Sequence, residues 1–154
     1  MHGDIAIEFS EHGGQFVITE DGDLKTDQGL ETSIGISLLT DRRAAPEDEL
    51  PAGETDRRGW LGDSLSPADS KIGSKIWLRM REKQHREVMH KIREDAQAAL
   101  AWLLQDKVVS RLSVQVINPR PGWWEMLAQY YEPNAKEAKN FRYALTWNAQ
   151  AAKR

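Results

Sequence analysis

Histidine is the side chain most often used both for metal binding and for proton transfer near neutral pH, and this chain has four. His85 and His90 stand five residues apart in a predicted helix, whereas two metal ligands on one helical face need a spacing of four. His2 lies near the N-terminus and His12 lies in a predicted turn. The sequence contains no cysteine, which excludes a thiolate nucleophile, a cysteine-ligated zinc site and a disulfide framework. We therefore expect no metal site and no cofactor.

Carboxylates are abundant, with 24 in 154 residues. Glycoside hydrolysis requires two carboxylates about 5–9 Å apart. With so many acidic residues, some pair at this distance is expected in any fold, so its presence would not indicate catalysis. None lies in an apolar segment that would raise a carboxyl pKa for acid catalysis. No G-x-S-x-G segment is present, residues 47–49 (EDE) lack calcium-loop spacing, and residues 73–75 (GSK) lack the upstream glycine of a phosphate-binding loop. We expect no catalysis, and a peptidoglycan hydrolase remains the enzymatic alternative.

Charge is divided unevenly along the chain. Residues 1–70 contain 16 acidic and 5 basic residues, a net of −11, whereas residues 71–154 contain 8 and 16, a net of +8. Either the two halves pack together, or unlike surfaces meet unlike neighbours in an assembly. The basic stretch 71–94, which includes Trp77, makes a nucleic-acid-binding module a further alternative. The overall pI of about 5.8 and the absence of a groove-reading motif argue against nucleic acid as a partner.

The pattern of apolar residues predicts a single α+β domain spanning residues 1–154. Alternation over 111–116, 124–130 and 141–147 predicts three strands in an antiparallel meander. Similar alternation at Ile5, Ile7 and Phe9 predicts N-terminal strands with a turn at 12–14. We expect the meander and the N-terminal strands to form an antiparallel sheet.

Two helices are expected to cover that sheet. Spacings of three and four predict a long helix over about 82–105, and a shorter helix over about 28–39 with Asp27 as its N-cap. Residues 73–80 carry a short buried element whose type the pattern leaves open. No run approaches the roughly 18 apolar residues of a membrane span, and the N-terminus lacks a signal-peptide pattern. We therefore expect no membrane partner.

The segment from about residue 40 to residue 72 is too long for an ordinary connection between elements and is predicted to be a functional loop. The motif at 40–43 (TDRR) recurs at 55–58, and Trp60 follows it. Arginine and tryptophan are enriched at the energetic centres of protein interfaces, although the same residues could instead fasten the loop to its own domain. The candidate partner-binding or loop-ordering residues are Asp41, Arg42, Arg43, Arg57, Arg58, Trp60, Asp63 and Trp77.

Several short motifs occur in a fixed order along the chain: 23–24 (DL), 29–32 (GLET), 37–43 (SLLTDRR), 50–51 (LP), 58–63 (RGWLGD), 73–78 (GSKIWL) and 99–103 (ALAWL). In this order the chain resembles the small baseplate wedge proteins of Mu-like phages and prophages. That family is in turn similar to the small wedge protein of larger contractile-tailed phages. Many relatives carry a second tryptophan where this chain has Leu61.

The resemblance implies a structural, non-catalytic subunit of a contractile tail. It would be assembled in the host cytoplasm, placed in the virion tail baseplate, and belong to a multi-subunit ring. Its partners would be other baseplate wedge proteins and the tail sheath, whose assembly it would help to initiate. The implied fold is similar to the C-terminal part of sheath subunits, in which neighbours share strands, and the segment containing Ile5, Ile7 and Phe9 is a candidate pairing strand. Some relatives carry a lysozyme label, which the residues of this chain do not support.

Overall fold

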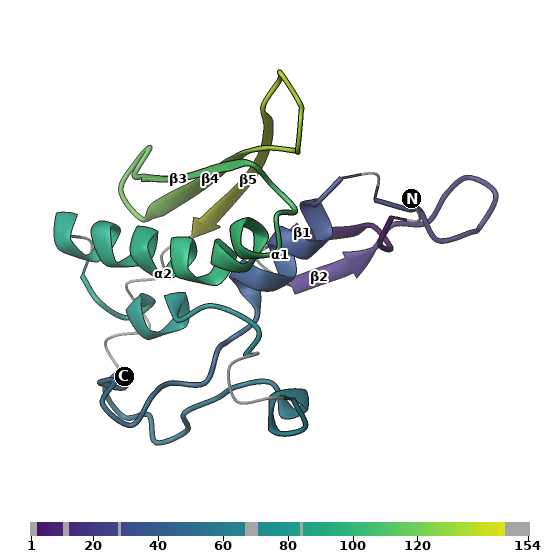
Figure 1. Ribbon diagram of the computed structural model, residues 1–154. Coiled ribbons are helices and arrows are strands. Elements are labelled where there is room, and N and C mark those ends of the chain that lie inside the picture. Colours follow the sequence, from purple (N-terminus) through teal and green to yellow (C-terminus); the bar gives the residue numbers. More distant parts are fainter. Residues whose placement is uncertain (1–2, 11–12, 28, 67–70, 84, 147–154) are drawn as a thin grey trace.

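The C-terminal part of the chain folds into a three-stranded antiparallel sheet. A computed structural model describes residues 3–10, 13–27, 29–66, 71–83 and 85–146 (Figure 1). The strands β3 (Arg111–Ile117), β4 (Trp123–Tyr131) and β5 (Lys139–Thr146) lie in that order, with Val114 opposite Ala128 and Ala128 opposite Phe141. The predicted meander is therefore confirmed, except that Trp147, at the predicted end of the third strand, lies outside the described residues.

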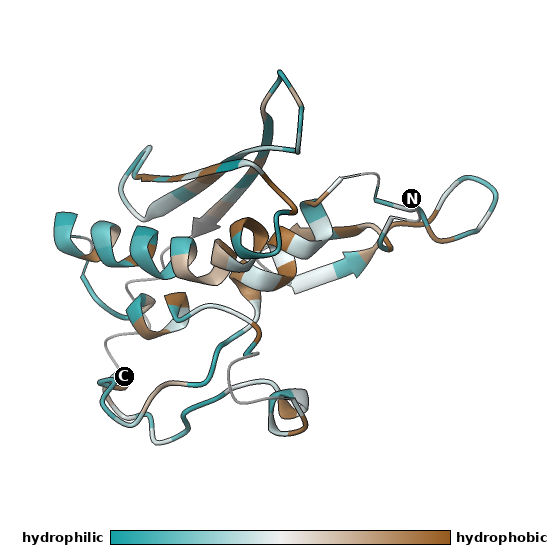
Figure 2. Ribbon diagram, viewed as in Figure 1, coloured by the Kyte–Doolittle hydropathy of each residue, from teal (hydrophilic) through white to brown (hydrophobic). Residues whose placement is uncertain are grey.

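The inner face of this sheet packs on the helix α2 (Arg86–Gln105). The side chains buried along β4 alternate with half-buried ones, as expected when only one face of a sheet is covered. Figure 2 shows that the C-terminal half of α2 is more apolar than its N-terminal half. The main core lies between these elements and includes Ile92, Ala96, Leu100, Leu103, Trp124 and Met126.

Helix α2 begins at Arg86, about one turn later than its periodicity predicts. A separate 3₁₀ turn, η2 (Ile76–Arg79), lies upstream of this helix and is the short element whose type the sequence leaves open. The backbone N–H of Glu82 donates to the carbonyl of Arg79 at 3.0 Å, and the Glu82 carboxylate pairs with the Arg79 guanidinium at 3.5 Å. Glu82 therefore ends the 3₁₀ turn and does not start α2.

The shorter helix α1 (Glu31–Leu39) also begins later than expected, and its N-cap position is Leu30. Asp27 still performs the capping role, because its Oδ2 accepts the N–H of Thr32 at 2.8 Å and its Oδ1 accepts the N–H of Gly29 at 2.8 Å. A carboxylate in this position binds an N–H that the first turn of a helix leaves without a partner. The predicted interaction is thus present although the predicted N-cap position is wrong.

The N-terminal strands form a sheet of their own. The strands β1 (Ile7–Ser10) and β2 (Gly13–Phe16) pair antiparallel, with Ile7 opposite Phe16. The pairing continues outward through bridges between Ile18 and Leu24 and between Ile5 and Thr26. Gly13 and Gly14 lie within β2, so their predicted place in the turn is wrong. We call residues 3–27 the N-terminal ribbon; it projects beyond the rest of the molecule (Figure 1).

Among the contacts that fix the N-terminal ribbon to the body is a close approach between Phe9 and Gly35. A Cβ atom on Gly35, in the middle of α1, would lie 2.0 Å from the ring of Phe9. Glycine costs a helix about 1 kcal/mol relative to alanine, and here it makes room for an aromatic ring of β1. Within the described residues, no helix is long and apolar enough to span a membrane.

Candidate interaction site

The predicted long loop starts and ends at the same point of the fold. Ser74 donates its N–H to the carbonyl of Thr40 at 2.9 Å and accepts the N–H of Arg42 at 3.0 Å. Gly73 has a φ of 97°, and a Cβ atom there would lie 2.3 Å from the carbonyl oxygen of Thr40. These contacts close the loop at its base beside the C-terminus of α1.

Arg58 is the residue that ties the loop together. Its guanidinium donates to Asp41 Oδ2 at 2.8 Å and to Glu54 Oε1 at 3.3 Å, and it lies 4.3 Å above the centroid of the Trp77 ring. Trp77 is 5% exposed and donates its indole N–H to the carbonyl of Arg42 at 2.8 Å. The structure therefore brings Asp41, Arg42, Arg58 and Trp77 together, in contacts that order the loop.

The neighbouring arginines also bind within the loop. The guanidinium of Arg57 donates to the carbonyls of Ala45, Pro46 and Asp48, while Arg43 donates to the carbonyl of Arg58 at 3.2 Å. Guanidinium groups suit this task because they present several donors in a fixed plane. These contacts join one part of the loop to another.

Trp60 differs from the arginines because it faces outward. It is 55% exposed and precedes the 3₁₀ turn η1 (Leu61–Ser64). Leu61 is 84% exposed and Leu65 is 89% exposed. We call Trp60, Leu61 and Leu65 the apolar tip. Trp60 is among the residues that the sequence indicates, whereas Leu61 and Leu65 are not, although apolar residues in an otherwise polar loop were a usable signal.

Asp63 holds the base of the apolar tip. Its Oδ1 accepts the N–H of Ile72 at 3.1 Å, whereas its buried Oδ2 has no partner among the described residues. Beside it, a groove of about 760 Å³ separates the loop from α1 and α2. Trp60 lines one part of this groove, and Trp102 lines another and donates to the Ser37 hydroxyl at 3.1 Å. Trp60 is therefore common to the groove and to the apolar tip.

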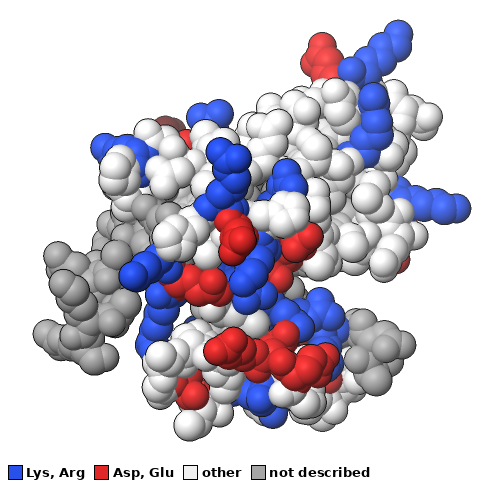
Figure 3. All heavy atoms as spheres, turned by 90° about the vertical axis from the view of Figure 1, so that its left-hand side faces the viewer, with Lys and Arg blue, Asp and Glu red and all other residues white. Residues whose placement is uncertain are grey.

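Ion pairs connect the acidic loop to the basic residues that follow it. Lys75 pairs with Asp48 at 2.6 Å and Arg81 pairs with Glu54 at 2.9 Å. Figure 3 shows acidic and basic side chains interspersed over the lower part of one face of the molecule. Part of the opposite charge of the two halves is therefore balanced within the chain, as the first explanation of the charge division requires.

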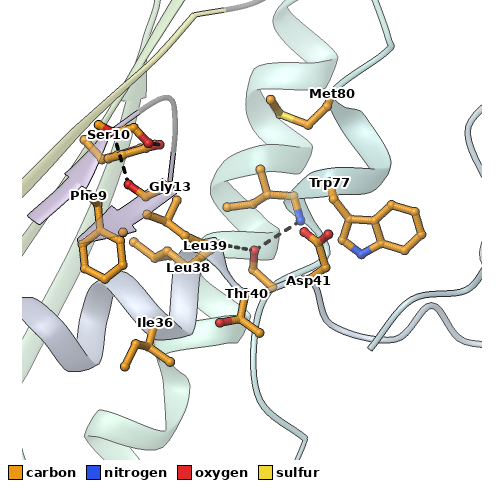
Figure 4. A pocket seen from close by; sticks show the side chains of 14 residues that line it. Phe9, Ser10, Gly13, Ile36, Leu38, Leu39, Thr40, Asp41, Trp77 and Met80 are labelled. Carbon is orange, nitrogen blue, oxygen red and sulfur yellow. Dashed lines mark hydrogen bonds between the residues drawn. The ribbon is translucent and has the colours of Figure 1, made fainter. Parts of the chain in front are cut away.

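A second, smaller cleft of about 320 Å³ lies between the N-terminal ribbon, α1 and η2. Figure 4 shows Phe9, Leu38, Leu39 and Met80 among its mostly apolar walls, with Asp41 at one side. The Asp41 carboxylate is already bound by Arg58. This cleft can accept apolar side chains, but it does not bring acid and base groups together.

The one described carboxyl group with a raised pKa lies elsewhere. Burial raises the pKa of Asp95 despite the Arg79 guanidinium 3.1 Å away, and Asp95 lines neither the groove nor the cleft. Within the described residues, no group of three His, Asp or Glu side chains could hold a metal ion. The geometry of the described residues offers contact surfaces and favours no catalytic centre.

Comparison with known proteins adds an independent finding. A family model described as phage protein GP46 matches residues 30–137. The baseplate protein gp46 of Escherichia phage Mu is 43% identical over 121 residues, covering 78% of this chain and 81% of that protein. The Mu-like prophage FluMu protein gp46 of Haemophilus influenzae is 33% identical over 117 residues, covering 76% of this chain and 78% of that protein.

Proposed function

The chain belongs to the phage GP46 family, and from this premise we propose that it is a wedge subunit of a contractile tail baseplate. The match to Mu-like phage and prophage proteins confirms the resemblance indicated by the ordered motifs. The phage Mu relative is named a baseplate protein, in agreement with the expectation of a structural protein that is not an enzyme. A structural role in the virion tail baseplate is the part of the function that this relative supports directly.

In the proposed role the subunit binds neighbouring wedge proteins in a ring and helps to start assembly of the tail sheath. It would join these partners in the host cytoplasm, before the tail is complete. The observation that carries the proposal is the relative's baseplate identity, and the structure supplies a surface suited to the task. No specific observation favours the hydrolase or the nucleic-acid alternative.

The apolar tip is the proposed wedge contact. Three large apolar side chains are 55–89% exposed on a loop that side-chain contacts of Arg57, Arg58 and Asp63 link together. Exposed apolar groups on a fixed scaffold bind partners with little loss of conformational freedom. The arginines therefore hold the loop in shape, and the contact itself is made by Trp60, Leu61 and Leu65.

Deletion and co-purification test this role. In the phage or prophage that encodes the chain, deletion should leave tails without a complete baseplate or sheath, and normal tails would overturn the proposal. Tagged wild-type protein should co-purify with wedge proteins, whereas Leu61→Asp with Leu65→Asp should reduce recovery by about tenfold or more. The matched control is Leu104→Asp, which changes another exposed leucine, on α2. Equal loss in that control would contradict the assignment of the tip.

A further inference from the structure

The N-terminal ribbon carries an apolar face that begins in the core and continues beyond α1. Residues directly opposite one another in an antiparallel pair share a face, so Ile7 and Phe16 lie on one side. Ile5 and Ile18 lie on the same side, because each is two residues from Ile7 or Phe16 along its strand. Leu24 joins them there because it is bridged to Ile18. Ile5, Phe16, Ile18 and Leu24 are 44–60% exposed. An apolar surface of this kind on a soluble domain marks a contact site.

The N-terminal ribbon is also strongly acidic. Its described residues include six carboxylates and a single basic residue, Lys25. The carboxylates are Asp4, Glu8, Glu20, Asp21, Asp23 and Asp27. The whole ribbon precedes the segment that the family model matches, residues 30–137. A partner for this surface must combine apolar groups with positive charge, and two ribbons placed face to face would bring like charges together.

The outer face of the C-terminal sheet has the complementary character. On the side of this sheet opposite α2, the alternation places Ile117, Trp123, Leu127 and Tyr131 together. Ile117 is 48% exposed, and the other three are half-buried. The Arg111 guanidinium lies 4.0 Å from the centre of the Tyr131 ring, and that of Arg120 lies 4.1 Å from the centre of the Trp123 ring. Glu125 on the same face pairs with Arg142 at 3.0 Å, so the arginines leave this face with an excess of positive charge.

We propose that the apolar face of the N-terminal ribbon packs on the outer sheet face of a second copy of this chain. Two sheet faces stack about 10 Å apart with their side chains between them. The contact joins an acidic surface to a basic one, so it is favoured over ribbon-to-ribbon pairing. Because it joins unlike surfaces, each copy keeps one free ribbon and one free sheet face, and the contact can extend into a ring or a filament.

This proposal does not rest on the baseplate role, since it concerns the purified chain alone. Sedimentation velocity of the full chain over a range of concentrations should show species heavier than a monomer at low salt. High salt should reduce them, because the Debye length falls from about 30 Å at 0.01 M to about 3 Å at 1 M. A monomer at every concentration and salt level would overturn the proposal.

Two variants that each lose one of the two faces give the sharper test. Phe16→Glu with Ile18→Glu removes the ribbon face, and Arg111→Glu with Ile117→Glu removes the sheet face. Each variant alone should associate about tenfold or more weakly than wild type, with an unchanged circular dichroism spectrum. A mixture of the two should form a dimer and nothing larger, because only one intact pair of faces remains.

Other results of the same experiment contradict the proposal. Self-association of the sheet variant alone, at wild-type strength, would indicate ribbon-to-ribbon pairing. Absence of the dimer in the mixture would exclude contact between unlike faces. The control variant Leu61→Ser with Leu65→Ser changes the apolar tip and should leave self-association unchanged; its loss would assign self-association to the tip.

Discussion

The guanidinium of Arg58 lies over the buried ring of Trp77 while it binds Asp41 and Glu54. One side chain therefore connects two separate points of the loop to an indole that itself donates to the Arg42 carbonyl. This arrangement links parts of a segment that has few buried apolar residues of its own. Its stability depends on directional contacts more than on burial.

Replacement of Arg58 by lysine should loosen the loop. Lysine keeps the charge but loses the planar fork that reaches Asp41 and Glu54 together, and it stacks less well on an indole. We expect a loss of about 1 kcal/mol in the free energy of unfolding and faster hydrogen exchange over residues 41–58. Arg86→Lys, at an exposed position of α2, is the matched control. Equal exchange in wild type and Arg58→Lys would contradict the assigned role.

Replacement of Gly73 by alanine should open the base of the loop. The added Cβ would lie 2.3 Å from the Thr40 carbonyl oxygen at a φ of 97°, and we expect a loss of about 1–3 kcal/mol. Gly53→Ala separates the two causes, because Gly53 also has a positive φ of 84° but no atom within 4 Å of the added Cβ. Thermal unfolding followed by circular dichroism measures the loss of stability in both variants. An equal loss in Gly73→Ala and Gly53→Ala would assign the cost to the positive φ and not to the clash with Thr40.

Replacement of Gly35 by alanine should destabilise the protein although alanine favours helices by about 1 kcal/mol. The new Cβ would lie 2.0 Å from the Phe9 ring, and overpacking of this kind costs about 1–3 kcal/mol. Hydrogen exchange in β1 should rise as the N-terminal ribbon separates from α1. In a double-mutant cycle with Phe9→Leu, the cost of Gly35→Ala should fall. A cost independent of residue 9 would show that Phe9 is not the obstacle.

Asp95 and Asp48 should contribute to the pH dependence of the free energy of unfolding with opposite signs. Burial raises the pKa of Asp95 above its ordinary value of 3.8, so the folded state binds its proton more tightly than the unfolded state does. Stability from this group is gained as pH falls towards 3.8 and is lost as pH rises through the folded pKa. Urea unfolding of wild type and Asp95→Asn at pH 7, 5.5 and 4.5 should show wild type gaining relative stability on acidification.

Asp48 provides the opposite case. Burial raises its pKa, but the hydrogen bonds from Lys75 and from the Ala45 N–H lower it more, and the net pKa is below 3.8. Its contribution is present above pH 3.8 and is lost as pH falls through the folded pKa. The difference in free energy of unfolding between wild type and Asp48→Asn should therefore disappear in strongly acidic solution. The same sign for both variants would contradict these pKa directions.

The sheet and the helices were predictable because their apolar residues repeat with a regular period. Leu112, Val114 and Val116 alternate strictly, and Ile92, Ala96 and Leu100 follow one helical face. The helix starts were less predictable, because local contacts decide them. Glu82 has the right type for a helix but donates its N–H to the preceding 3₁₀ turn.

The candidate site was predictable as a segment and less so residue by residue. Arg57 and Arg58 are adjacent and identical, yet one binds backbone carbonyls and the other binds carboxylates and an indole. Leu61 and Leu65 lie in and just after a four-residue 3₁₀ turn, which is too short to show a period. Only the folded loop shows that both leucines face outward.

The closure of the loop at Thr40 and Ser74 has a consequence for how such proteins change over evolution. Residues inserted near the apolar tip would not move α1 or η2, because the hydrogen bonds at the base already fix both ends. A doubling of loop length adds only about 0.6 kcal/mol of closure entropy. The part of the loop around the apolar tip can therefore lengthen or shorten between lineages while the contacts of Arg58 with Asp41 and Trp77 stay as they are.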